Sequence, residues 1–434
     1  MLLIRPVPSR VADPSVRERF VPLNLSIRGH ALLNKETILR KTFPSLYPSK
    51  KVVTANDIEN GHSFKTFLVP LDVKFHDGAI DNIMDLYFSG RQNDLPADFY
   101  YKDGDKPSNL QPDYFSESII LKKLLASLDF AQNVEDADLI LVTALPTIAC
   151  RWPLKRCNDG SKPKQWYQNL HSQVETFAPK DKTSGKKFLY LATEDTANIL
   201  DRDHFSNPNN LVVTLGPAVK ENVLVVPSLN LMKELQPSHW EGCKPIEERK
   251  VFLSANFGIR KWLKDRIAIS KELDAYNGTK TISREMYASG RRDLVDSLLV
   301  ISAPGDLPFQ KRFYDAILQC TIPVVVFREV KGIGKTYWSN VKYGKFPPFP
   351  IDKTYPPLPF GVSYSDFVFE VDGKVIEEGN LMKYLESIKT EDFEMKLKNI
   401  TKFRNRFVYD LEGSSEDAFS IMLEELAMRL KSKK

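Results

Sequence analysis

At 434 residues, of which 42% are hydrophobic and 11% aromatic, the chain is long enough to bury two hydrophobic cores. Its 61 basic and 56 acidic residues leave a net charge of only +5, which argues against a nucleic-acid-binding protein, because such proteins concentrate a larger basic excess. No stretch approaches the roughly 18 to 20 apolar residues that span a membrane, and the first ten residues contain no signal-peptide cleavage site. We therefore expect a soluble, cytoplasmic protein without a transmembrane segment.

Regularly spaced apolar runs in the first half of the chain predict the strands of one parallel sheet. Helical patterns lie between these runs, and such alternation is typical of a parallel α/β domain. Residues 1 to about 60 show no clean period, so we assign them to an N-terminal extension of this domain, which covers residues 1–236. The predicted strands are 67–69, 139–143, 188–192, 211–215 and 223–226.

A second alternating set predicts another α/β domain over residues 237–390. Pro237 and Pro245 mark the connection that leads into it. Residues 391–434 are predicted to be helical throughout, with a basic tail. The expected fold class is therefore α/β, with two Rossmann-like domains that each contain a parallel sheet. The predicted strands of the second domain are 251–255, 298–301, 322–327 and 367–371.

Residues 297–329 are the most informative part of the second domain, because they read as strand, turn, helix and strand. The first apolar run stops at Ala303-Pro304-Gly305-Asp306, where proline fixes φ and glycine tolerates conformations closed to other residues. A helical pattern over 309–319 and the strand 322–327 complete a βαβ unit. Its turn is therefore expected at the carboxyl end of the sheet, where nucleotides bind in such folds.

Two polar side chains of this helix fit a nucleotide. Arg312 lies in the first turn, where free amides, the helix dipole and a guanidinium all favour phosphate. Asp315 lies almost one turn further on, where a carboxylate can accept hydrogen bonds from ribose hydroxyls. The alternative is an ordinary crossover in which Arg312 and Asp315 form a solvated ion pair.

This unit resembles the characteristic segment of the exostosin family of glycosyltransferases. That segment consists of a serine-led apolar strand, a proline–glycine turn, an arginine-led helix and a cysteine close to an Ile-Pro-Val strand. The matching residues here are 297–302, Ala303-Pro304-Gly305, Arg312-Phe313-Tyr314-Asp315-Ala316-Ile317 and Cys320-Thr321-Ile322-Pro323-Val324. Looser matches extend the resemblance over roughly residues 65 to 390, at 65–75, 114–117, 134–142 and 249–258.

The chain departs from the family pattern at four places. Val300 stands where a second cysteine is frequent, Thr321 separates Cys320 from the Ile-Pro-Val run that a cysteine usually precedes directly, and Asp315 stands where glutamate is usual. Residues 330–359 form an insertion that is rich in proline, aromatic residues and lysine. These differences concern the donor and the loop that faces the acceptor, so the resemblance leaves the identity of both open.

The resemblance implies a fold and a reaction class. Exostosin relatives adopt the GT-B architecture, in which the parallel sheets of two Rossmann-like domains face an interdomain cleft, and they are inverting transferases that use nucleotide-sugar donors. It follows that residues 1–236 would bind the acceptor, residues 237–390 the nucleotide sugar, and the helices of 391–434 would cross back to the first domain. A member without a membrane anchor is expected in large DNA viruses of algae, which would place it in the host cytoplasm.

Such a reaction needs cations for the leaving diphosphate and one base for the acceptor hydroxyl. Our candidates for donor binding are Arg312, Arg260, Arg266, Asp315, Asn256, Gly258, Pro304 and Gly305, with Asn256 and Gly258 allowing close backbone approach. Glu194 and Asp195 directly follow a predicted strand and are the favoured base, with His76 or Asp77 as the alternative. No Asp-x-Asp motif occurs in a strand-end loop, so we expect catalysis without a metal ion or any cofactor beyond the donor.

Two other sequence patterns, a glycine-rich segment and the spacing of the cysteines, are weaker indications of function. The segment Gly332-Ile333-Gly334-Lys335-Thr336 resembles the end of a phosphate-binding loop, but Glu329 stands where that motif needs glycine, and no helix follows, so we reject an NTPase. The four cysteines, Cys150, Cys157, Cys243 and Cys320, lack metal-ligand spacing, and we expect buried free thiols. A disulfide between Cys150 and Cys157 is the alternative in an oxidising compartment.

The expected function is therefore inverting transfer of a sugar from a UDP-sugar, with UDP-xylose slightly favoured, to a hydroxyl of an oligosaccharide or glycoprotein glycan. One alternative is a catalytically silent glycan-binding partner of another glycosyltransferase. Another is a sugar-nucleotide epimerase, although the chain has no GxGxxG motif near its N-terminus.

Overall fold

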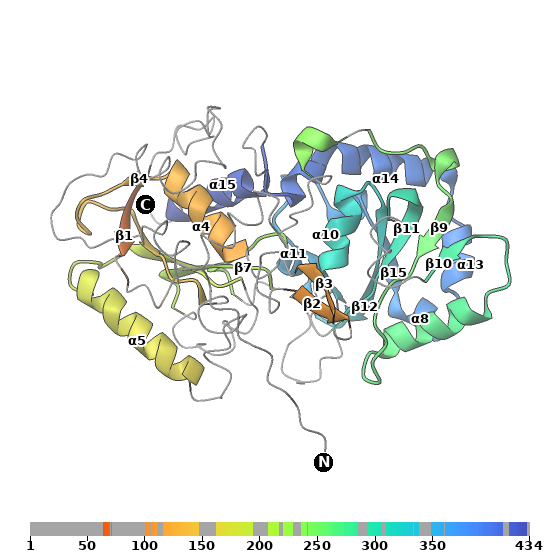
Figure 1. Cartoon of the computed structure of the whole chain (residues 1–434), viewed down its shortest axis with the longest axis horizontal. Coiled ribbons are helices and arrows are strands. Elements are labelled where there is room, and N and C mark those ends of the chain that lie inside the picture. Colours follow the sequence, from red (N-terminus) through yellow and green to blue (C-terminus); the bar gives the residue numbers. More distant parts are fainter. Residues whose placement is uncertain are drawn as a thin grey trace, which may run out of the picture.

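The computed structural model of the chain shows two α/β domains side by side (Figure 1). A short antiparallel hairpin, β2 (Tyr100–Asp103) and β3 (Lys106–Leu110), is separate from both main sheets. The structure describes residues 64–69, 71, 100–103, 106–110, 116–146, 162–193, 207–216, 220–228, 236–240, 242–284, 294–305, 310–332, 334–337, 349–359, 361–410 and 416–431.

The described residues of the first domain form a parallel sheet of six strands in the order β4-β1-β5-β6-β7-β8. Strands β5, β7 and β8 are buried along their whole length, as in parallel sheets covered on both faces. The predicted strands of this domain are confirmed, with small differences at their ends. The strands are β1 (Lys65–Val69), β4 (Asp129–Phe130), β5 (Leu139–Val142), β6 (Lys187–Leu191), β7 (Asn210–Thr214) and β8 (Val223–Val225).

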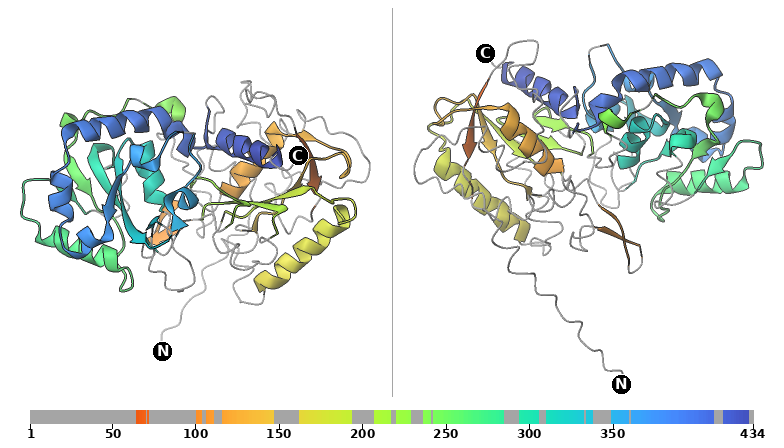
Figure 2. Two further views of the ribbon diagram at one scale, coloured as in Figure 1. Left: turned by 180° about the vertical axis from the view of Figure 1, so that it is seen from behind. Right: turned by 45° about the horizontal axis from the view of Figure 1, so that its top comes forward.

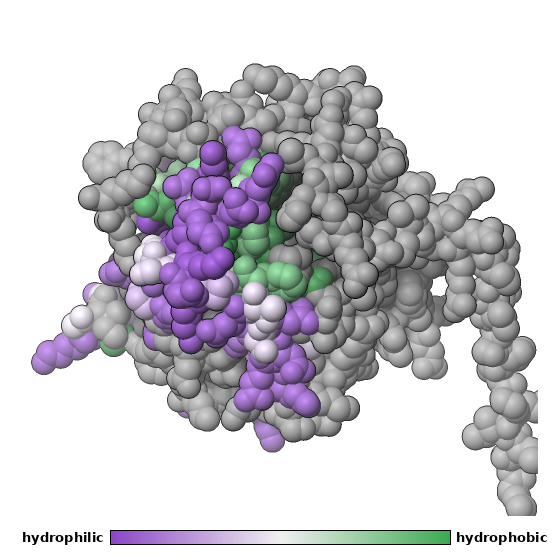
Figure 3. Space-filling model, turned by 90° about the vertical axis from the view of Figure 1, so that its left-hand side faces the viewer, coloured by the Kyte–Doolittle hydropathy of each residue, from purple (hydrophilic) through white to green (hydrophobic). Residues whose placement is uncertain are grey.

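Helices cover both faces of this sheet. Helix α5 (Lys162–Phe177) packs one face through Tyr167, Leu170 and Val174, while α4 (Ser116–Ser127) packs the other. The last helix, α15 (Ala418–Lys431), joins α4 in the same hydrophobic cluster, so the C-terminal end of the chain lies in the first domain (Figure 2). At the outer end of this domain the described surface is mainly hydrophilic (Figure 3), and it includes exposed ion pairs such as Lys182–Glu135.

The second domain contains a mainly parallel sheet. Its parallel strands are ordered β10-β9-β11-β12-β15, and β13 and β14 extend β12 as antiparallel strands. The predicted strands are again confirmed, although the last one begins two residues later than expected, at Phe369. The strands are β9 (Val251–Ser254), β10 (Ile282–Ser283), β11 (Ser297–Ser302), β12 (Ile322–Val330), β13 (Gly334–Tyr337), β14 (Phe349–Pro350) and β15 (Phe369–Asp372).

The segment that resembles a phosphate-binding loop forms the turn between β12 and β13. Gly332 and Gly334 have φ of +82° and +88°, which favour glycine, and they reverse the chain into an antiparallel pairing. The described residues here show a hairpin and not a strand followed by a helix, which agrees with the rejection of an NTPase. The same insertion contributes Tyr355, whose ring stacks on Phe313 at 4.0 Å, to the domain core.

Helices cover both faces of the second sheet as well. Helices α8 (Lys264–Ala275), α12 (Gly373–Glu377) and α13 (Leu381–Glu386) lie on one face, and α10 (Lys311–Leu318) and α14 (Thr390–Phe403) lie on the other (Figures 1 and 2). The expected fold class is thus confirmed: two Rossmann-like domains with parallel-dominated sheets, in a GT-B-like arrangement.

The prediction that residues 391–434 are helical throughout is wrong. Helix α14 is followed by a 3₁₀ turn, Arg404–Phe407, and the described residues 408–410 and 416–417, which lie between this turn and α15, are not helical. The reason is that Phe407 and Val408 belong to the core of the second domain whereas Tyr409 belongs to that of the first. A continuous helix cannot place consecutive residues in two separate cores, so burial of these side chains overrides helix propensity.

The prediction of free thiols at Cys243 and Cys320 is also wrong, because these residues form a disulfide with Cα atoms 5.4 Å apart. They are 77 residues apart in sequence, so spacing along the chain gave no indication of the pair. The bond joins the connecting segment to the end of α10, where Arg404 stacks over Trp240 at 4.1 Å and donates to the Cys320 sulfur. Cys150 and Cys157 lie outside the described residues. No described helix has both the length and the apolar character needed to cross a membrane.

Candidate functional site

The strand order of the second sheet identifies one position at its edge, and ligands bind at this kind of position in similar folds. The chain runs first through β9, then outward to β10, and then to β11 on the other side of β9. The loops that leave β9 and β11 therefore diverge from neighbouring strands, which opens a crevice at the carboxyl end of the sheet in such folds. Register pairs Ser254 with Val300, so residues 255–258 and 303–305 leave the sheet side by side.

Arg266 of α8 joins these two loops. Its Nε and Nη2 donate to the carbonyl oxygens of Pro304 and Ala303 at 3.0 and 3.1 Å, and its Nη1 donates to that of Gly258 at 3.1 Å. Nη2 also donates to Oε1 of Gln310 at 2.8 Å. The side chain is 8% exposed. The guanidinium thus fixes both loops relative to the start of α10, and most of its donors are used within the protein.

Gly305 is needed because of this arrangement. A Cβ atom at this position would lie 2.7 Å from Nη2 of Arg266 and 2.7 Å from Nε2 of Gln310, closer than any real Cβ contact. A side chain at this position would therefore require Arg266 or Gln310 to move, which glycine avoids.

Helix α10 presents the two residues expected to contact a nucleotide. Phe313 and Ile317 are fully buried, and burying side chains of this size contributes about 1.5–3 kcal/mol each, which anchors the helix on the sheet. Arg312 is half-buried in the first turn. The carboxylate of Asp315 is 13% exposed and accepts from Nζ of Lys311 at 2.6 Å, so Lys311 holds its orientation.

A row of small polar side chains lies on the sheet face that α10 covers. Phe252 on this face packs against Phe393 of α14, and strand alternation places Ser254 and Asn256 on the same side. Asn256 continues the register to the position opposite Ser302 of β11. Within the described residues, the hydroxyl of Ser254 and both amide atoms of Asn256 are buried and have no hydrogen-bond partner.

The row ends at Ser302, whose buried hydroxyl also has no hydrogen-bond partner within the described residues and lies close to the phenol of Tyr355. Burial raises the pKa of Tyr355 well above its ordinary value, so its hydroxyl is neutral and can donate at physiological pH. Gly258 and Arg260 lie at the exposed end of the neighbouring loop, where the Arg260 guanidinium stacks over Trp262 at 5.6 Å. The expected donor-binding residues thus lie on the segments that follow the carboxyl ends of β9 and β11, apart from Arg266 of α8, which donates hydrogen bonds to both segments.

The expected catalytic bases lie outside the described residues. His76 and Asp77 follow β1, and Glu194 and Asp195 follow β6, but the structure describes the chain only to Leu71 and Thr193 on these paths. At the latter point the backbone N–H of Thr193 donates to Oε1 of Glu117 at 3.0 Å. Glu117 is fully buried at the start of α4, so a carboxylate lies at the carboxyl end of β6.

Sequence reasoning missed Glu117, Lys311, Gln310, Ser254 and Ser302. The Lys311–Asp315 pair has the i, i+4 spacing that allows helical ion pairs, which is a signal that was available. The pairing of Gln310 with Arg266 joins residues from separate elements and carries no local signal.

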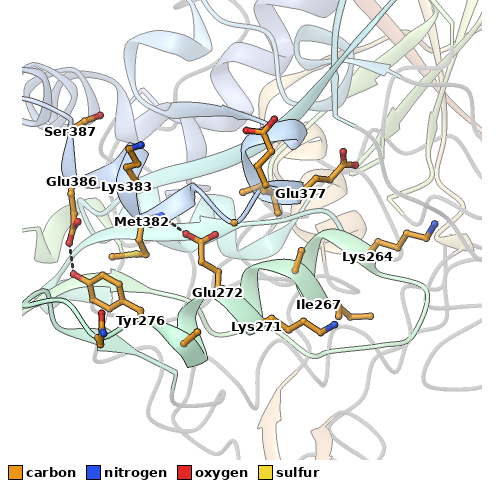
Figure 4. A pocket seen from close by; sticks show the side chains of 16 residues that line it. Lys264, Ile267, Lys271, Glu272, Tyr276, Glu377, Met382, Lys383, Glu386 and Ser387 are labelled. Atoms are coloured by element: carbon orange, nitrogen blue, oxygen red, sulfur yellow. Dashed lines mark hydrogen bonds between the residues drawn. The ribbon is translucent and has the colours of Figure 1, made fainter.

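A separate pocket of about 1080 Å³ lies between α8 and the α12–α13 pair, on the face of the sheet opposite α10 (Figure 4). Glu272 accepts from the backbone N–H of Met382 at 2.7 Å across it, and Tyr276 donates to Glu386. Lysine and glutamate side chains alternate around it, so it has no single charge preference. None of the expected site residues lines it.

Comparisons with known proteins add little to these observations. No family model and no curated protein matches the chain. Among solved structures, the chain is similar to a glycosyltransferase from Rickettsia africae ESF-5, with 10% sequence identity, a TM-score of 0.38, and coverage of 86% of this chain and 99% of that chain. At this identity and TM-score the similarity adds nothing to the fold that the two sheets define, and the exostosin resemblance remains an expectation drawn from the motifs.

Proposed function

We propose that the protein is an inverting glycosyltransferase that moves a sugar from a UDP-sugar to a hydroxyl of a glycan, with UDP-xylose the first donor to test. The observation that carries this proposal is that Arg312 and Asp315 of α10, and Asn256 after β9, lie on the segments that follow the two strands at which the strand order reverses. The motif resemblance supports the same reading, because it assigns the donor to this domain.

Each group in this constellation has a task in the proposed reaction. Arg312 and the amides at the start of α10 bind the diphosphate, which gains negative charge as the sugar leaves. Asp315, held by Lys311, accepts hydrogen bonds from the ribose hydroxyls. Arg266 acts as a positioning residue, because its donors fix the two loops. Arg260 at the exposed loop adds a second cation on the diphosphate side.

The chemical step balances without any other reactant. A base in the first domain removes the proton of the acceptor hydroxyl, the hydroxyl oxygen forms a bond to the anomeric carbon, and the bond from that carbon to the diphosphate oxygen breaks. The nucleoside diphosphate leaves with the bonding electrons, and the anomeric configuration inverts. Glu194 with Asp195, or His76 with Asp77, are the residues proposed for the base, and no metal ion is required.

Calorimetric and thermal-shift titrations of the full chain test this proposal. Wild type and Arg312→Ala are titrated with UDP, GDP, UDP-xylose, UDP-galactose, UDP-glucuronic acid and UDP-N-acetylglucosamine, each with and without Mn²⁺. We expect saturable UDP binding by wild type that does not depend on Mn²⁺. Loss of a charge-assisted phosphate contact worth roughly 1.5–3 kcal/mol should weaken binding by roughly tenfold to a hundredfold in the variant.

The matched control is Arg249→Ala, which also removes a guanidinium of this domain. Arg249 donates to carbonyl oxygens of Lys244, Ser297 and Cys320, away from the loops that leave β9 and β11. Its removal should lower the melting temperature and leave UDP affinity of the folded fraction unchanged. A folded wild type that binds no nucleotide would contradict the enzyme proposal and favour a glycan-binding partner.

A further inference from the structure

Several buried polar groups of the second domain have no hydrogen-bond partner within the described residues, and among them Asn256 is the side chain with two such atoms. The residue is 5% exposed, and both Oδ1 and Nδ2 lack a partner in this part of the chain. Leaving a buried amide unsatisfied is unfavourable, and most such groups in native proteins have partners. An unsatisfied pair of atoms at the carboxyl end of a parallel sheet therefore points to a partner that arrives with the ligand.

The chemistry of that partner follows from the amide itself. Nδ2 only donates hydrogen bonds and Oδ1 only accepts them. An ionised phosphate only accepts, so it can satisfy Nδ2 but leaves Oδ1 facing negative charge. The matching ligand group carries a donor beside an acceptor, as the lactam edge of a nucleobase and a pair of neighbouring sugar hydroxyls do.

The surroundings of Asn256 fit an uncharged group. On the same face of the sheet lie the buried hydroxyls of Ser254 and Ser302, which also have no hydrogen-bond partner within the described residues, and the neutral phenol of Tyr355 lies close to Ser302. Arg266 directs its donors to the carbonyl oxygens of the neighbouring loops. These side chains supply hydrogen bonds without net charge.

We propose that Asn256 is a specificity-determining contact for the uncharged part of the donor, to which its amide donates one hydrogen bond and from which it accepts another. The proposal rests on the proposed function, since it divides the donor between two groups of residues. Arg312 and the start of α10 bind the diphosphate, and Asn256 binds either the nucleoside or the transferred sugar.

The test compares Asn256→Leu with wild type by calorimetry, using inorganic pyrophosphate, UDP and UDP-xylose as ligands. Leucine is similar in volume and has no polar atoms. We expect pyrophosphate affinity to remain unchanged and UDP-xylose affinity to fall roughly tenfold to a hundredfold, as for loss of one or two buried hydrogen bonds. If the loss is already present with UDP, the partner is the nucleoside; if it appears only with UDP-xylose, the partner is the sugar.

The free protein provides a second readout. Because leucine removes an unsatisfied amide, Asn256→Leu should melt at or above the temperature of wild type without ligand. The matched control is Asn222→Leu in the first domain, where the buried amide donates to the carbonyl oxygens of Asn207 and Asn210. This control should melt several degrees lower and bind UDP-xylose as wild type does.

Three results would overturn the proposal. Asn256→Leu that binds all three ligands like wild type shows that the amide does not contact the donor, while loss of UDP binding in Arg312→Ala would leave the proposed function standing. Equal loss of pyrophosphate and UDP-xylose affinity shows that Asn256 supports the diphosphate. A wild type that binds no nucleotide overturns the proposed function and this inference together. Should leucine prevent folding, Asn256→Ala provides the same comparison.

Discussion

Two buried polar side chains, one in each domain, differ in how many of their hydrogen-bonding atoms have partners. Asp417, which is 2% exposed, accepts from the ammonium of Lys123 at 2.8 Å, from three backbone N–H groups and from the hydroxyl of Ser420. Asn256, which is 5% exposed, has no partner for either amide atom. Both side chains lie at loop-to-element junctions, so burial alone does not explain the difference.

The difference indicates that Asp417 serves the stability of the fold and that Asn256 serves ligand binding. Asp417 joins the start of α15 to α4 and to the backbone of Asp410, and thereby holds the end of the chain on the first domain. The amide of Asn256 makes no hydrogen bond within the part of the chain that the structure describes. A buried group that is fully satisfied contributes to the free energy of folding, whereas one that is left unsatisfied reduces it and is retained where a ligand supplies the missing bonds.

The largest effect expected from this comparison is loss of stability in Asp417→Ala. The substitution leaves Lys123 without its carboxylate partner and removes the cap of α15, for a total of about 3–5 kcal/mol. The measurement is urea denaturation followed by circular dichroism. Asp417→Asn is the matched control, since it keeps an acceptor for the backbone N–H groups and should lose less. A midpoint equal to that of wild type in Asp417→Ala would show that these contacts do not stabilise the chain.

Arg266→Lys tests the guanidinium whose donors are hydrogen-bonded to the loops that follow β9 and β11. A single ammonium cannot reach the carbonyl oxygens of Gly258, Ala303 and Pro304 together, so we expect a loss of about 2–3 kcal/mol. Donor affinity should fall as well, because the loops are no longer fixed. Both quantities are measured by thermal denaturation and calorimetry with UDP.

The control for Arg266→Lys is Arg260→Lys in the loop that precedes α8. Arg260 is exposed and stacks over Trp262, so its stability effect should stay within about 0.5 kcal/mol. Equal destabilisation by the two substitutions would refute the assignment of Arg266 as the residue that fixes the loops.

The smallest effect is expected for Lys311→Met, which removes the ion partner of Asp315 but keeps a helix-forming, unbranched side chain. Partly exposed helical pairs contribute about 0.3–0.5 kcal/mol, so the melting temperature should change little. Affinity for UDP should fall a few-fold while that for pyrophosphate stays constant, since Asp315 is assigned to the ribose. Unchanged UDP affinity would contradict the proposed role of Lys311 in holding the carboxylate of Asp315 for the ribose.

Local patterns in the sequence predicted the elements well where one element buries one continuous apolar face. The helix expected over 309–319 is observed at Lys311–Leu318, and the buried strands β9, β11 and β12 lie where apolar runs placed them. The reversal of strand order was not predictable in this way. The apolar periodicity of a sequence predicts where strands and helices lie, but it does not predict which strands pair in the sheet.

Features that depend on distant residues were missed or wrong. The Cys243–Cys320 disulfide joins positions 77 residues apart, and the end of the helical pattern after Phe407 reflects which core takes Tyr409. The sequence singled out Asn256 for backbone approach to a ligand. Only the fold shows that its side chain is buried and unsatisfied, because satisfaction is a property of neighbours.

Hydrogen exchange of the backbone amides, measured by mass spectrometry with and without saturating UDP-xylose, tests the central claim most directly. We predict that UDP-xylose slows exchange in peptides that cover 254–260 and 303–315 and leaves exchange unchanged in β7 and α15 of the first domain. Protection confined to the first domain or to the pocket between α8 and α13, with binding shown by calorimetry, would contradict the assignment of the donor site.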